Sequence, residues 1–380
     1  MSGWREETLE NMLTISKSQF QPDNKTDLPY IGLEHINAEK LRINGFGSSL
    51  DIASNKFHFK RNDVLFGKLR PYFRKVIKAK FDGVCSTDIW VIRAKKEVHQ
   101  SYLFYFLANW EFVDLANSGE GGSRMPRADW NFLKQTKWTI PPLPEQKAIA
   151  DVLSALDDKI DLLHRQNHTL EQMAETLFRQ WFVEEAQEDW EEKPLSSIAT
   201  FTNGLACQKF PVQIGEQGLP VLKIKELTSG ISDSSDWATE TVKSEYIVEN
   251  GDIIFAWSAS LMVKIWSGQK CVLNQHLFNV KSKYYPKWFY YEWCKFHLAE
   301  FISVAQSHAT TMGHIKRKDL DEAMVKIPSS ETLATMSQTM KPLLDKRIIN
   351  SQQIQTLETL RDTLLPKLIS GEVRVAFQTA

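Results

Sequence analysis

Two groups of residues have the types and spacing of catalytic or metal sites, and both lie in one polar stretch. Asp157-Asp158-Lys159 has the Asp-x-Lys form of many nuclease centres, but no Pro-Asp pair stands at the usual distance upstream. His164 and His168 would share one face of a helix, yet no His-Glu-x-x-His motif accompanies them. The pattern is typical of a solvated helix face, and we expect neither a nuclease centre nor a zinc site.

Other signatures of catalysis are missing from the sequence. There is no Gly-x-x-x-x-Gly-Lys-Ser/Thr loop to hold phosphates and no Asn-Pro-Pro-aromatic motif of a DNA methyltransferase. No nucleophile can be assigned together with a base and an orienting acid. We therefore expect no catalytic residue, metal ion or cofactor in this chain, with an enzyme that has an unrecognised site as the alternative.

The remaining chemistry is basic and aromatic. Residues 56–80 hold nine Lys and Arg side chains against one acid, Asp63, and place them among rings and strand-forming residues. A basic loop at 119–127 has a counterpart at 307–318. Arg can read guanine edges, and Lys can hold phosphates, although such runs are often only solvated surface charge. The predicted DNA contacts are Lys56, Lys60, Arg61, Lys68, Arg70, Arg74, Lys75, Arg124, Arg127, Lys223, Lys225, Lys264, His276, His314, Lys316, Arg317 and Lys318.

The elements that must position these residues occur twice. A shift of about 187 residues carries Ile140 onto Ile327 and Asp158-Lys159 onto Asp345-Lys346. A long-period repeat of this kind indicates two similar modules. If a local twofold axis relates them, their trailing helices run in opposite directions and pair as an antiparallel coiled coil. The sequence thus predicts an α+β fold of two mixed modules, each followed by a long helix.

The first helix is marked by a Pro-Pro-Leu-Pro-Glu-Gln start, where Pro144 can occupy the first turn without losing a hydrogen bond. Apolar residues then recur with the alternating spacing of four and three residues that defines a coiled-coil seam. Asn167 is its one polar member and is expected to fix the register. The predicted seam comprises Ile149, Leu153, Leu156, Ile160, Leu163, Asn167, Leu170 and Leu177.

The second helix is less regular. We expect Ser329 or Ser330 to cap it, Pro366 to end or kink it, and Gly371 to stop the chain from continuing as a helix. The repeat predicts seam residues Leu343, Ile354, Leu357 and Leu364, but it also places the polar residues Arg347, Asn350 and Arg361 on the seam. The register of this helix therefore stays open.

Each module contains short strand-like runs. Examples are Val64-Leu65-Phe66, Ile89-Trp90-Val91-Ile92 and Gly251-Asp252-Ile253-Ile254-Phe255, and the segments 28–33 and 219–224 are predicted to be equivalent strands. The acidic run Glu184–Lys193 is typical of a solvated connector. The predicted division is a first module at 1–142, a helical region at 143–183, the connector at 184–193, a second module at 194–328, and a helical region with the C-terminal tail at 329–380.

Composition favours an intracellular globular protein. The 380 residues suffice for two or three cores, the first ten are not those of a signal peptide, and the richest apolar run is too short to span a membrane. Four scattered cysteines are typical of buried thiols in a reducing compartment, so we expect a cytoplasmic location. The net charge of −1 hides an asymmetry, since residues 1–142 carry +5 and residues 143–192 carry −9.

In this order, the motifs resemble those of the specificity subunits of type I restriction-modification systems. The resemblance covers nearly the whole chain and rests on Ile140–Gln146 with Leu156-Asp157, on Asp63–Pro71, on Gly251–Ser260 with Leu273–His276, and on Leu364–Glu372. One departure is Ser329-Ser330, which replaces the Pro-Leu-Pro-Glu-Gln form at the start of the second helix. This departure bears on the pairing of the helices and the symmetry of partner sites.

The resemblance implies a non-catalytic subunit whose two modules are target-recognition domains, each reading one half of a bipartite double-stranded DNA target. The helices would set the spacer and dock two methyltransferase (M) subunits, which bind S-adenosylmethionine and methylate adenine. Restriction/translocase (R) subunits would join for cleavage, and no membrane is involved. An orphan DNA reader, or an antirestriction adaptor that binds M subunits as a decoy, is the alternative.

Overall fold

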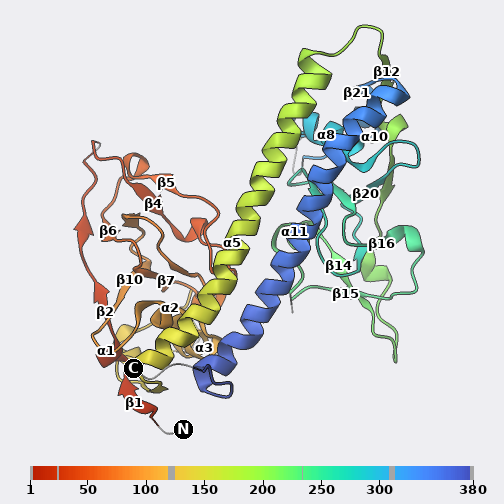
Figure 1. Cartoon of the computed structure of the whole chain (residues 1–380). Helices are drawn as coiled ribbons and strands as arrows, with labels where there is room; N and C mark the ends of the chain where they lie inside the picture. Colours follow the sequence, from red (N-terminus) through yellow and green to blue (C-terminus); the bar gives the residue numbers. More distant parts are fainter. Residues whose placement is uncertain (1–2, 24, 119–124, 233, 308–312, 377–380) are drawn as a thin grey trace. The chain divides into compact units, whose positions relative to one another are not determined.

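The computed structural model describes residues 3–23, 25–118, 125–232, 234–307 and 313–376. Contacts divide the chain into two units: unit 1 is Met1–Lys159 with Leu357–Ala380, and unit 2 is Ile160–Thr356. Each unit therefore contains one globular module together with parts of both long helices, α5 (Leu143–Arg179) and α11 (Ser330–Ser370). Figure 1 shows the two helices in yellow-green and blue.

Unit 1 is built on two main sheets and a short ribbon. Strands in the first sheet, in spatial order, are β2 (Leu13–Ser16), β10 (Ile89–Ala94), β7 (Val64–Gly67) and β8 (Val76–Lys78). The second sheet contains β3 (Gln19–Phe20), β6 (Lys56–Phe59), β9 (Gly83–Cys85), β4 (Pro29–Ile31) and β5 (Gly47–Ser48). The ribbon pairs β1 (Arg5–Thr8) with β11 (Lys137–Ile140).

Helices cover the first sheet of unit 1 and form its main core. They are α1 (Leu9–Met12), α2 (Gln100–Ala108), α3 (Trp110–Asn117) and α4 (Trp130–Leu133). In α2, all residues from Tyr102 to Ala108 are buried, which explains the apolar run noted in the sequence. Among the described residues, no helix is both long and apolar enough to cross a membrane.

Unit 2 repeats this plan. Its first sheet contains β13 (Thr200–Asn203), β20 (Leu277–Lys281), β17 (Ile253–Ala256) and β18 (Met262–Ile265). Its second sheet contains β15 (Trp237–Ala238), β14 (Leu219–Leu222), β19 (Cys271–Leu273) and β16 (Ile247–Val248). Its ribbon pairs β12 (Glu191–Pro194) with β21 (Met324–Ile327). Its helices are α6 (Leu195–Ile198), α7 (Ile224–Ser229), α8 (Lys287–Phe296), α9 (Leu298–Ser307) and α10 (Arg317–Glu322).

The strands predicted to be equivalent occupy equivalent places. In unit 1, β4 pairs in parallel with β9, with Ile31 opposite Cys85. In unit 2, β14 pairs in parallel with β19, with Leu222 opposite Leu273. The predicted strands at 64–66, 89–92 and 251–255 correspond to β7, β10 and β17. The α+β fold of two similar modules is therefore confirmed.

Both helix starts follow their local signals. Helix α5 begins at Leu143, with Pro144 in its first turn. At the start of α11, the backbone N–H of Thr332 donates to Ser329 Oγ at 3.1 Å, so Ser329 caps the helix. Of the two effects predicted for Pro366, an end of the helix is ruled out because α11 continues to Ser370, and a kink stays a prediction. Gly371 follows with φ +78°, a conformation that suits glycine and stops the helix.

The two helices pair in an antiparallel sense within each unit. In unit 1 the start of α5 packs on the end of α11, and Ile149 and Leu153 share a core with Leu365 and Leu368. In unit 2 the end of α5 packs on the start of α11, where Phe178 and Leu344 belong to one cluster. Short apolar contacts thus tie each long helix to the module beside it.

Burial along the helices follows the first seam closely and the second only in part. Ile149, Leu153, Ile160 and Leu163 are buried, whereas Leu156, Asn167, Leu170 and Leu177 are half-buried. On α11, Ile354 is buried, while Leu343, Leu357 and Leu364 are half-buried beside the better buried Met340, Leu344, Leu365 and Leu368. The polar residues on the repeat positions are themselves enclosed, with Asn350 0 % and Arg361 1 % exposed.

Candidate nucleic-acid interface

Three loops meet at one end of the first sheet in unit 1, and we call them the three-loop surface of unit 1. They are residues 68–75, 86–88 and 125–131. Lys68 N donates to Asp88 O at 2.9 Å, Ala128 N donates to Lys68 O at 2.9 Å, and Arg70 N donates to Pro126 O at 2.8 Å. These backbone bonds hold the side chains of Lys68, Arg70 and Arg127 on one surface.

Unit 2 has the same three bonds at equivalent positions, and residues 257–261, 274–276 and 313–317 form its three-loop surface. Trp257 N donates to His276 O at 3.3 Å, Ile315 N donates to Trp257 O at 3.1 Å, and Ala259 N donates to Gly313 O at 2.9 Å. The equivalence extends to backbone conformation. Arg70 and Ala259 both adopt the left-handed region, with φ of 51° and 58°.

The aspartate below each surface is structural. In unit 1, Asp63 accepts two bonds from the Arg93 guanidinium, at 2.7 and 2.8 Å, and one from Lys60 N at 2.8 Å. In unit 2, Asp252 Oδ2 accepts from Asn279 Nδ2 at 3.0 Å and lies 3.0 Å from Lys281 Nζ. Each carboxylate closes the turn that begins β7 or β17, so the Asp in these two motifs supports the sheet.

The two three-loop surfaces carry different side chains on this shared scaffold. Unit 1 presents Lys68, Arg70 and Arg127, and Arg127 lies 3.5 Å from the Asp88 carboxylate. Unit 2 presents Trp257 and His276, with Ser258 Oγ 3.1 Å from His276 Nδ1. Unit 1 thus carries cationic side chains, which suit base edges and phosphates, whereas the Trp257 Nε1–H of unit 2 is donated to Asn203 Oδ1 at 3.1 Å.

Exposure divides the predicted DNA contacts into three groups. Eight are exposed: Lys60, Arg61, Arg127, Lys225, His276, Lys316, Arg317 and Lys318. Six are half-buried: Lys68, Arg70, Lys75, Lys223, Lys264 and His314. Two are buried, Lys56 and Arg74, and Arg124 lies outside the described residues. Of these, the structure brings together Lys68, Arg70 and Arg127 in unit 1, and His276, His314, Lys316 and Arg317 in unit 2.

Several of the lysines bind protein groups. Lys56 Nζ donates to the Ser54 carbonyl at 3.0 Å, and burial lowers its pKa. Lys75 Nζ donates to Leu33 O at 2.6 Å, and burial lowers its pKa as well. In unit 2, Lys225 Nζ donates to Ser234 Oγ at 2.7 Å, Lys223 pairs with Asp236, and Lys318 lies 3.1 Å from Glu322. Lys56 is thus a structural residue, and its predicted DNA contact is not supported.

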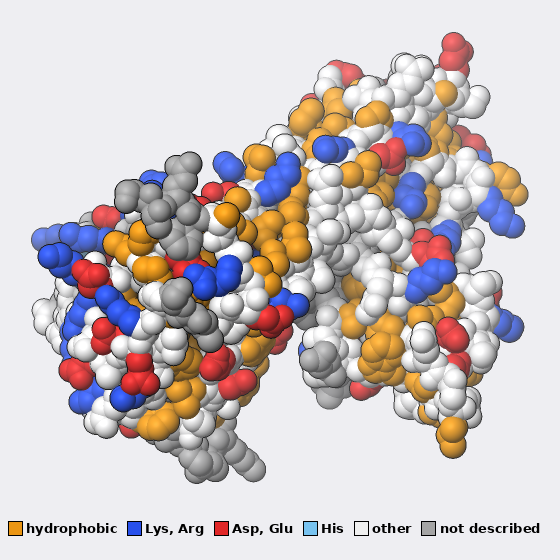
Figure 2. Space-filling model, turned by 60° about the horizontal axis from the view of Figure 1, so that its bottom comes forward, with side chains coloured by type: hydrophobic (Ala, Val, Ile, Leu, Met, Phe, Trp, Pro, Cys, Tyr) orange, Lys and Arg blue, Asp and Glu red, His pale blue; other side chains and the backbone are white. Residues whose placement is uncertain are grey.

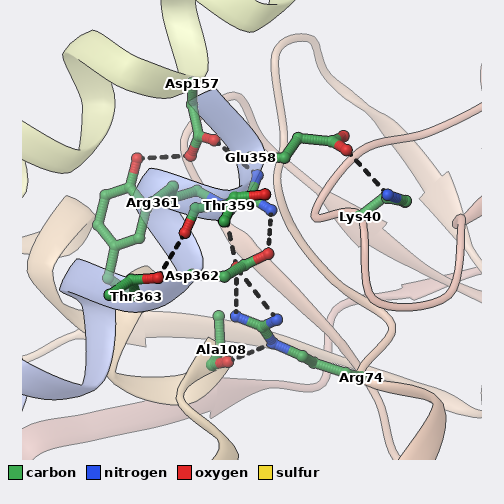
Figure 3. Close-up of polar contacts among 10 residues, drawn as sticks. Lys40, Arg74, Ala108, Asp157, Glu358, Thr359, Arg361, Asp362 and Thr363 are labelled. Atoms are coloured by element: carbon green, nitrogen blue, oxygen red, sulfur yellow. Dashed lines mark hydrogen bonds and ion pairs between the residues drawn. The ribbon is translucent and has the colours of Figure 1, made fainter. Parts of the chain in front are cut away.

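Arg74 belongs to the helices as well. Its side chain is 2 % exposed, its Nε donates to Ala108 O at 2.6 Å, and its Nη1 lies 3.3 Å from the Asp362 carboxylate. Figure 3 shows this guanidinium directed at α11. The sequence prediction for Arg74 was therefore wrong, because a basic residue in a basic run was assumed to face the solvent.

A polar network that sequence reasoning missed lies where α5 and α11 pack in unit 1 (Figure 3). Arg361 Nη1 donates to Asp157 Oδ1 at 2.9 Å, and Arg361 Nη2 donates to Asp362 Oδ2 at 3.1 Å. Tyr105 of α2 donates to Asp157 Oδ2 at 2.7 Å. Burial opposes the charge on Arg361, but the neighbouring carboxylates outweigh it and raise its pKa. The available signal was an arginine at a repeat position where the first seam has an apolar residue.

Unit 2 has its own network, made from different residues. Arg347 of α11 lies 3.0 Å from Glu171 of α5, and Lys295 of α8 lies 2.8 Å from the same carboxylate. Glu292 is 3 % exposed beside them, and burial raises its pKa to about 7. Asn167 Nδ2 donates to Ser351 Oγ at 3.1 Å across the same helix pair.

Both ends of the chain meet Glu145, the acid of the Pro-Leu-Pro-Glu-Gln motif. Glu145 is 0 % exposed, and Trp4 Nε1 donates to its Oε2 at 3.1 Å. Arg374 Nη2 donates to the same oxygen at 2.8 Å, and its guanidinium lies 5.7 Å from the Trp4 ring centroid. The C-terminal tail is therefore attached to the start of α5 within unit 1.

Other candidate chemistry is not assembled. All four cysteines are free and buried, and burial raises the pKa of Cys207 to about 11, which disfavours the reactive thiolate. Within the described ranges no cluster of three or more His, Cys, Asp or Glu side chains could hold a metal ion. Figure 2 shows basic side chains interspersed with acidic ones rather than one continuous basic face.

Comparisons with known proteins agree with this arrangement. The family model described as "Type I restriction modification DNA specificity domain" matches residues 1–172 and 187–359, once in each half. The MjaIX specificity subunit of Methanocaldococcus jannaschii is 29 % identical over 74 % of this chain and 71 % of its own length. The EcoDI specificity subunit of Escherichia coli is 26 % identical over 43 % of this chain and 37 % of its length.

A solved structure shares the fold. The crystal structure of the type I restriction-modification S subunit from M. genitalium has a TM-score of 0.56 and 15 % identity, and the match covers 100 % of this chain and 97 % of that one. The family model matches twice, once for each of two similar modules with a long helix. The chain belongs to the type I restriction-modification DNA specificity domain family, as a specificity subunit with two recognition domains.

Proposed function

We propose that this chain is a non-catalytic subunit that reads a bipartite double-stranded DNA target, one half with each three-loop surface. The observation that carries the proposal is the pair of equivalent scaffolds with different side chains. The same three backbone bonds support Lys68, Arg70 and Arg127 in unit 1, and Trp257, His276 and His314 in unit 2. One scaffold with two different sets of side chains suits two half-targets of different sequence.

The helices supply the second part of the proposal. The paired segments of α5 and α11 would hold the spacer between the halves and dock two M subunits. These partners would bind S-adenosylmethionine and methylate adenine, and R subunits would add cleavage. Two readers on a stiff support multiply discrimination, because each mismatched base pair costs about 1–3 kcal/mol.

Binding by the chain alone should be weak and salt-sensitive. The net charge of −1, and the ion pairs that occupy Lys223, Lys318 and Arg127, leave few cations for phosphates. Affinity from phosphate contacts scales with the number of counterions released. We expect tight specific binding only when M subunits contribute their own phosphate contacts. Nanomolar specific binding by the isolated chain at physiological salt would argue against this division of labour.

The test is co-expression with the M subunit of the same system, followed by sequencing that detects methylated adenine across the host genome. A bipartite methylated motif is expected, and replacing Lys68, Arg70 and Arg127 with Gln should remove the preference in one half only. A stable complex without methylation would instead favour the antirestriction adaptor. Absence of any complex would overturn the proposed docking role.

A further inference from the structure

A pocket opens beside the three-loop surface of unit 1. Its volume is about 580 Å³, within the range of sites that enclose small ligands. The lining includes the rings of Trp90 and Trp130, whose centroids lie 6.2 Å apart with planes at 77°, together with Lys17, Lys68 and Lys95. Lys68 belongs to the first loop of the surface and Trp130 to the third, so the pocket adjoins the candidate interface.

The cations of this pocket are available. Lys95 Nζ donates to Glu10 O at 2.7 Å, which holds it at the rim. Lys17 and Lys68 form no side-chain hydrogen bond or ion pair with the part of the chain that is described. Among the described residues that line the pocket, Glu10 is the only acid, against three lysines. The pocket therefore combines flat apolar rings with excess positive charge.

Unit 2 shows how the same position looks when it is closed. In unit 1, β2 pairs with β10 so that Ile15 lies opposite Ile92, and in unit 2 Phe201 lies opposite Val280. This register makes Lys17 and Asn203 equivalent, since Lys17 lies two residues after Ile15, just past the end of β2, and Asn203 lies two residues after Phe201. The pairing of β7 with β10, and of β17 with β20, likewise makes Lys68 equivalent to Trp257 and Trp90 equivalent to Phe278.

In unit 2 these three side chains fill the position themselves. Trp257 stacks on Phe278 with ring centroids 5.7 Å apart and planes at 26°, and Trp257 Nε1 donates to Asn203 Oδ1 at 3.1 Å. In unit 1, Lys68 takes the place of the Trp257 indole. Lys17 takes the place of Asn203, which accepts the indole hydrogen bond in unit 2. Two ammonium groups repel each other and cannot stack, so Trp90 has no counterpart of the Trp257 indole and stacks within its own sheet, on Phe66 of β7, with ring centroids 5.9 Å apart and planes at 21°.

We propose that this pocket binds an unstacked nucleotide, with its base against the Trp90 and Trp130 rings and its phosphate at Lys17 and Lys68. Aromatic rings provide stacking surfaces for bases of any sequence, and lysines neutralise the phosphate. A base within a duplex has both faces covered, so the ligand is an extrahelical or single-stranded nucleotide. The inference rests on the proposed DNA-reading function and adds a site to unit 1 alone.

The experiment is photo-crosslinking of the full chain to a single-stranded oligonucleotide that carries 5-iodouracil, with the attached peptide identified by mass spectrometry. Crosslinks are expected at Trp90 or Trp130. Crosslinks only at other aromatic residues, or none, would overturn the proposal. A fully paired duplex with the same base analogue should give several-fold less product at these two residues, and equal yields would show that an unstacked base is not required.

The same site can be tested by giving Lys17 and Lys68 the residue types found at the equivalent positions of unit 2. These substitutions remove no buried side chain. The double variant Lys17→Asn with Lys68→Trp recreates the closing pair of unit 2 and should abolish the crosslink while the chain keeps its circular dichroism spectrum and Tm. Lys96→Gln, which removes an exposed charge next to Lys95 but does not line the pocket, should leave the yield unchanged. An unaltered yield in the double variant would contradict the model.

Two further measurements are needed. One distinguishes a free nucleotide from DNA as the ligand, and the other distinguishes failure of this site from failure of the proposed DNA-reading function. Competition by free dTMP as effective as by the oligonucleotide would identify a free nucleotide as the ligand and overturn the DNA assignment. Methylation of a bipartite motif by the complex, measured in parallel, reports on the proposed function itself. A methylating complex whose pocket fails to crosslink would reject this site and leave the DNA-reading function standing.

Discussion

Asp157 on α5 and Arg361 on α11 form an ion pair of 2.9 Å between residues that lie more than two hundred positions apart in the chain. The Arg361 side chain is 1 % exposed, and the Asp157 side chain is 23 % exposed. Asp362 and Tyr105 complete the hydrogen bonding of the pair. In unit 1 the two helices are therefore joined by a specific polar contact as well as by apolar packing.

Replacing one partner of this ion pair should lower the free energy of unfolding more than replacing both partners. Arg361→Ala leaves the Asp157 carboxylate without its cationic partner and creates a cavity. We therefore expect the free energy of unfolding to fall by about 3 kcal/mol. Asp157→Leu combined with Arg361→Met should recover most of it, since well-packed apolar pairs often replace buried ion pairs at little cost. Urea unfolding measures both variants.

The control for this prediction is an ion pair at the surface. Lys137 and Glu6 lie 2.7 Å apart, but both side chains are more than 60 % exposed. Lys137→Ala should leave the urea midpoint unchanged, because exposed pairs contribute little. A single variant at Arg361 that behaves like Lys137→Ala would show that the buried network does not hold the helices together.

The contact between Glu145 and Arg374 should stabilise the packing of the C-terminal tail on the start of α5 in unit 1. Arg374→Ala leaves the fully buried Glu145 carboxylate with only Trp4 as a side-chain donor, and we expect faster amide hydrogen exchange at the start of α5 and in β1. Exchange in unit 2 should not change. Lys367→Ala, at the end of α11, removes a cation that lies 3.4 Å from the exposed Glu372 of the tail and is the matched control. Uniform exchange changes in both units would contradict a local role.

Stability should fall with rising pH because of Glu292. Burial raises its pKa from 4.5 to about 7 in the folded chain, while nearby Lys295 and Arg347 act in the opposite direction. Between pH 4.5 and 7 the folded state binds more protons than the unfolded state at this site, so this contribution to stability declines over that window and is constant above it. Glu292→Gln should therefore flatten the dependence of Tm on pH.

The comparison that isolates this group is the difference in Tm between the chain and each variant across pH 4 to about 8, because other titrating groups cancel. Glu188→Gln, at an exposed site in the acidic connector, should give a constant difference. An equal pH profile for Glu292→Gln and the unaltered chain would show that Glu292 keeps an ordinary pKa.

Each three-loop surface should act on its own half of the target. Arg70→Gln should weaken recognition in one half by about 1–3 kcal/mol if it contacts a base, and His276→Ala should affect the other half. The measurement is the sequence of methylated sites in the complex with M subunits. A contact with a phosphate would instead weaken binding to all sequences and reduce the salt dependence.

The helices should determine the spacer. Deleting the four residues His164–Asn167, about one helical turn, removes the Asn167 contact to Ser351 in unit 2 and shortens α5. We expect a changed spacer or a loss of recognition, with both half-target preferences retained where methylation persists. Loss of preference within a half-target would mean that the helices do more than separate the two readers.

Much of the fold could be predicted from the sequence because its signals are local. The repeat of about 187 residues located α5 and α11, Ser329 and Gly371 marked the ends of α11, and aromatic and β-branched runs marked β7, β10 and β17. Helix periods and caps depend on residues a few positions apart, so a single sequence carries them. Pro366 does not end α11, because Leu365 and Leu368 on either side of it are buried in the core of unit 1 and keep that turn helical.

The partners of polar residues were decided only by the tertiary structure. Arg74 lies in a run of cations in the sequence, yet Asp362, 288 positions away, neutralises it at the helix surface. The sequence places Arg347 and Arg361 at seam positions without indicating a partner for either. The fold places Glu171 opposite Arg347 and Asp157 opposite Arg361. The Trp257 indole stacks on Phe278 and bonds to Asn203, whereas Lys68 at the equivalent position does not, and these neighbours come from strands distant in the sequence. A chain of residues specifies its own helices and strands locally, but a buried charge or a binding pocket depends on which distant segments the fold brings into contact.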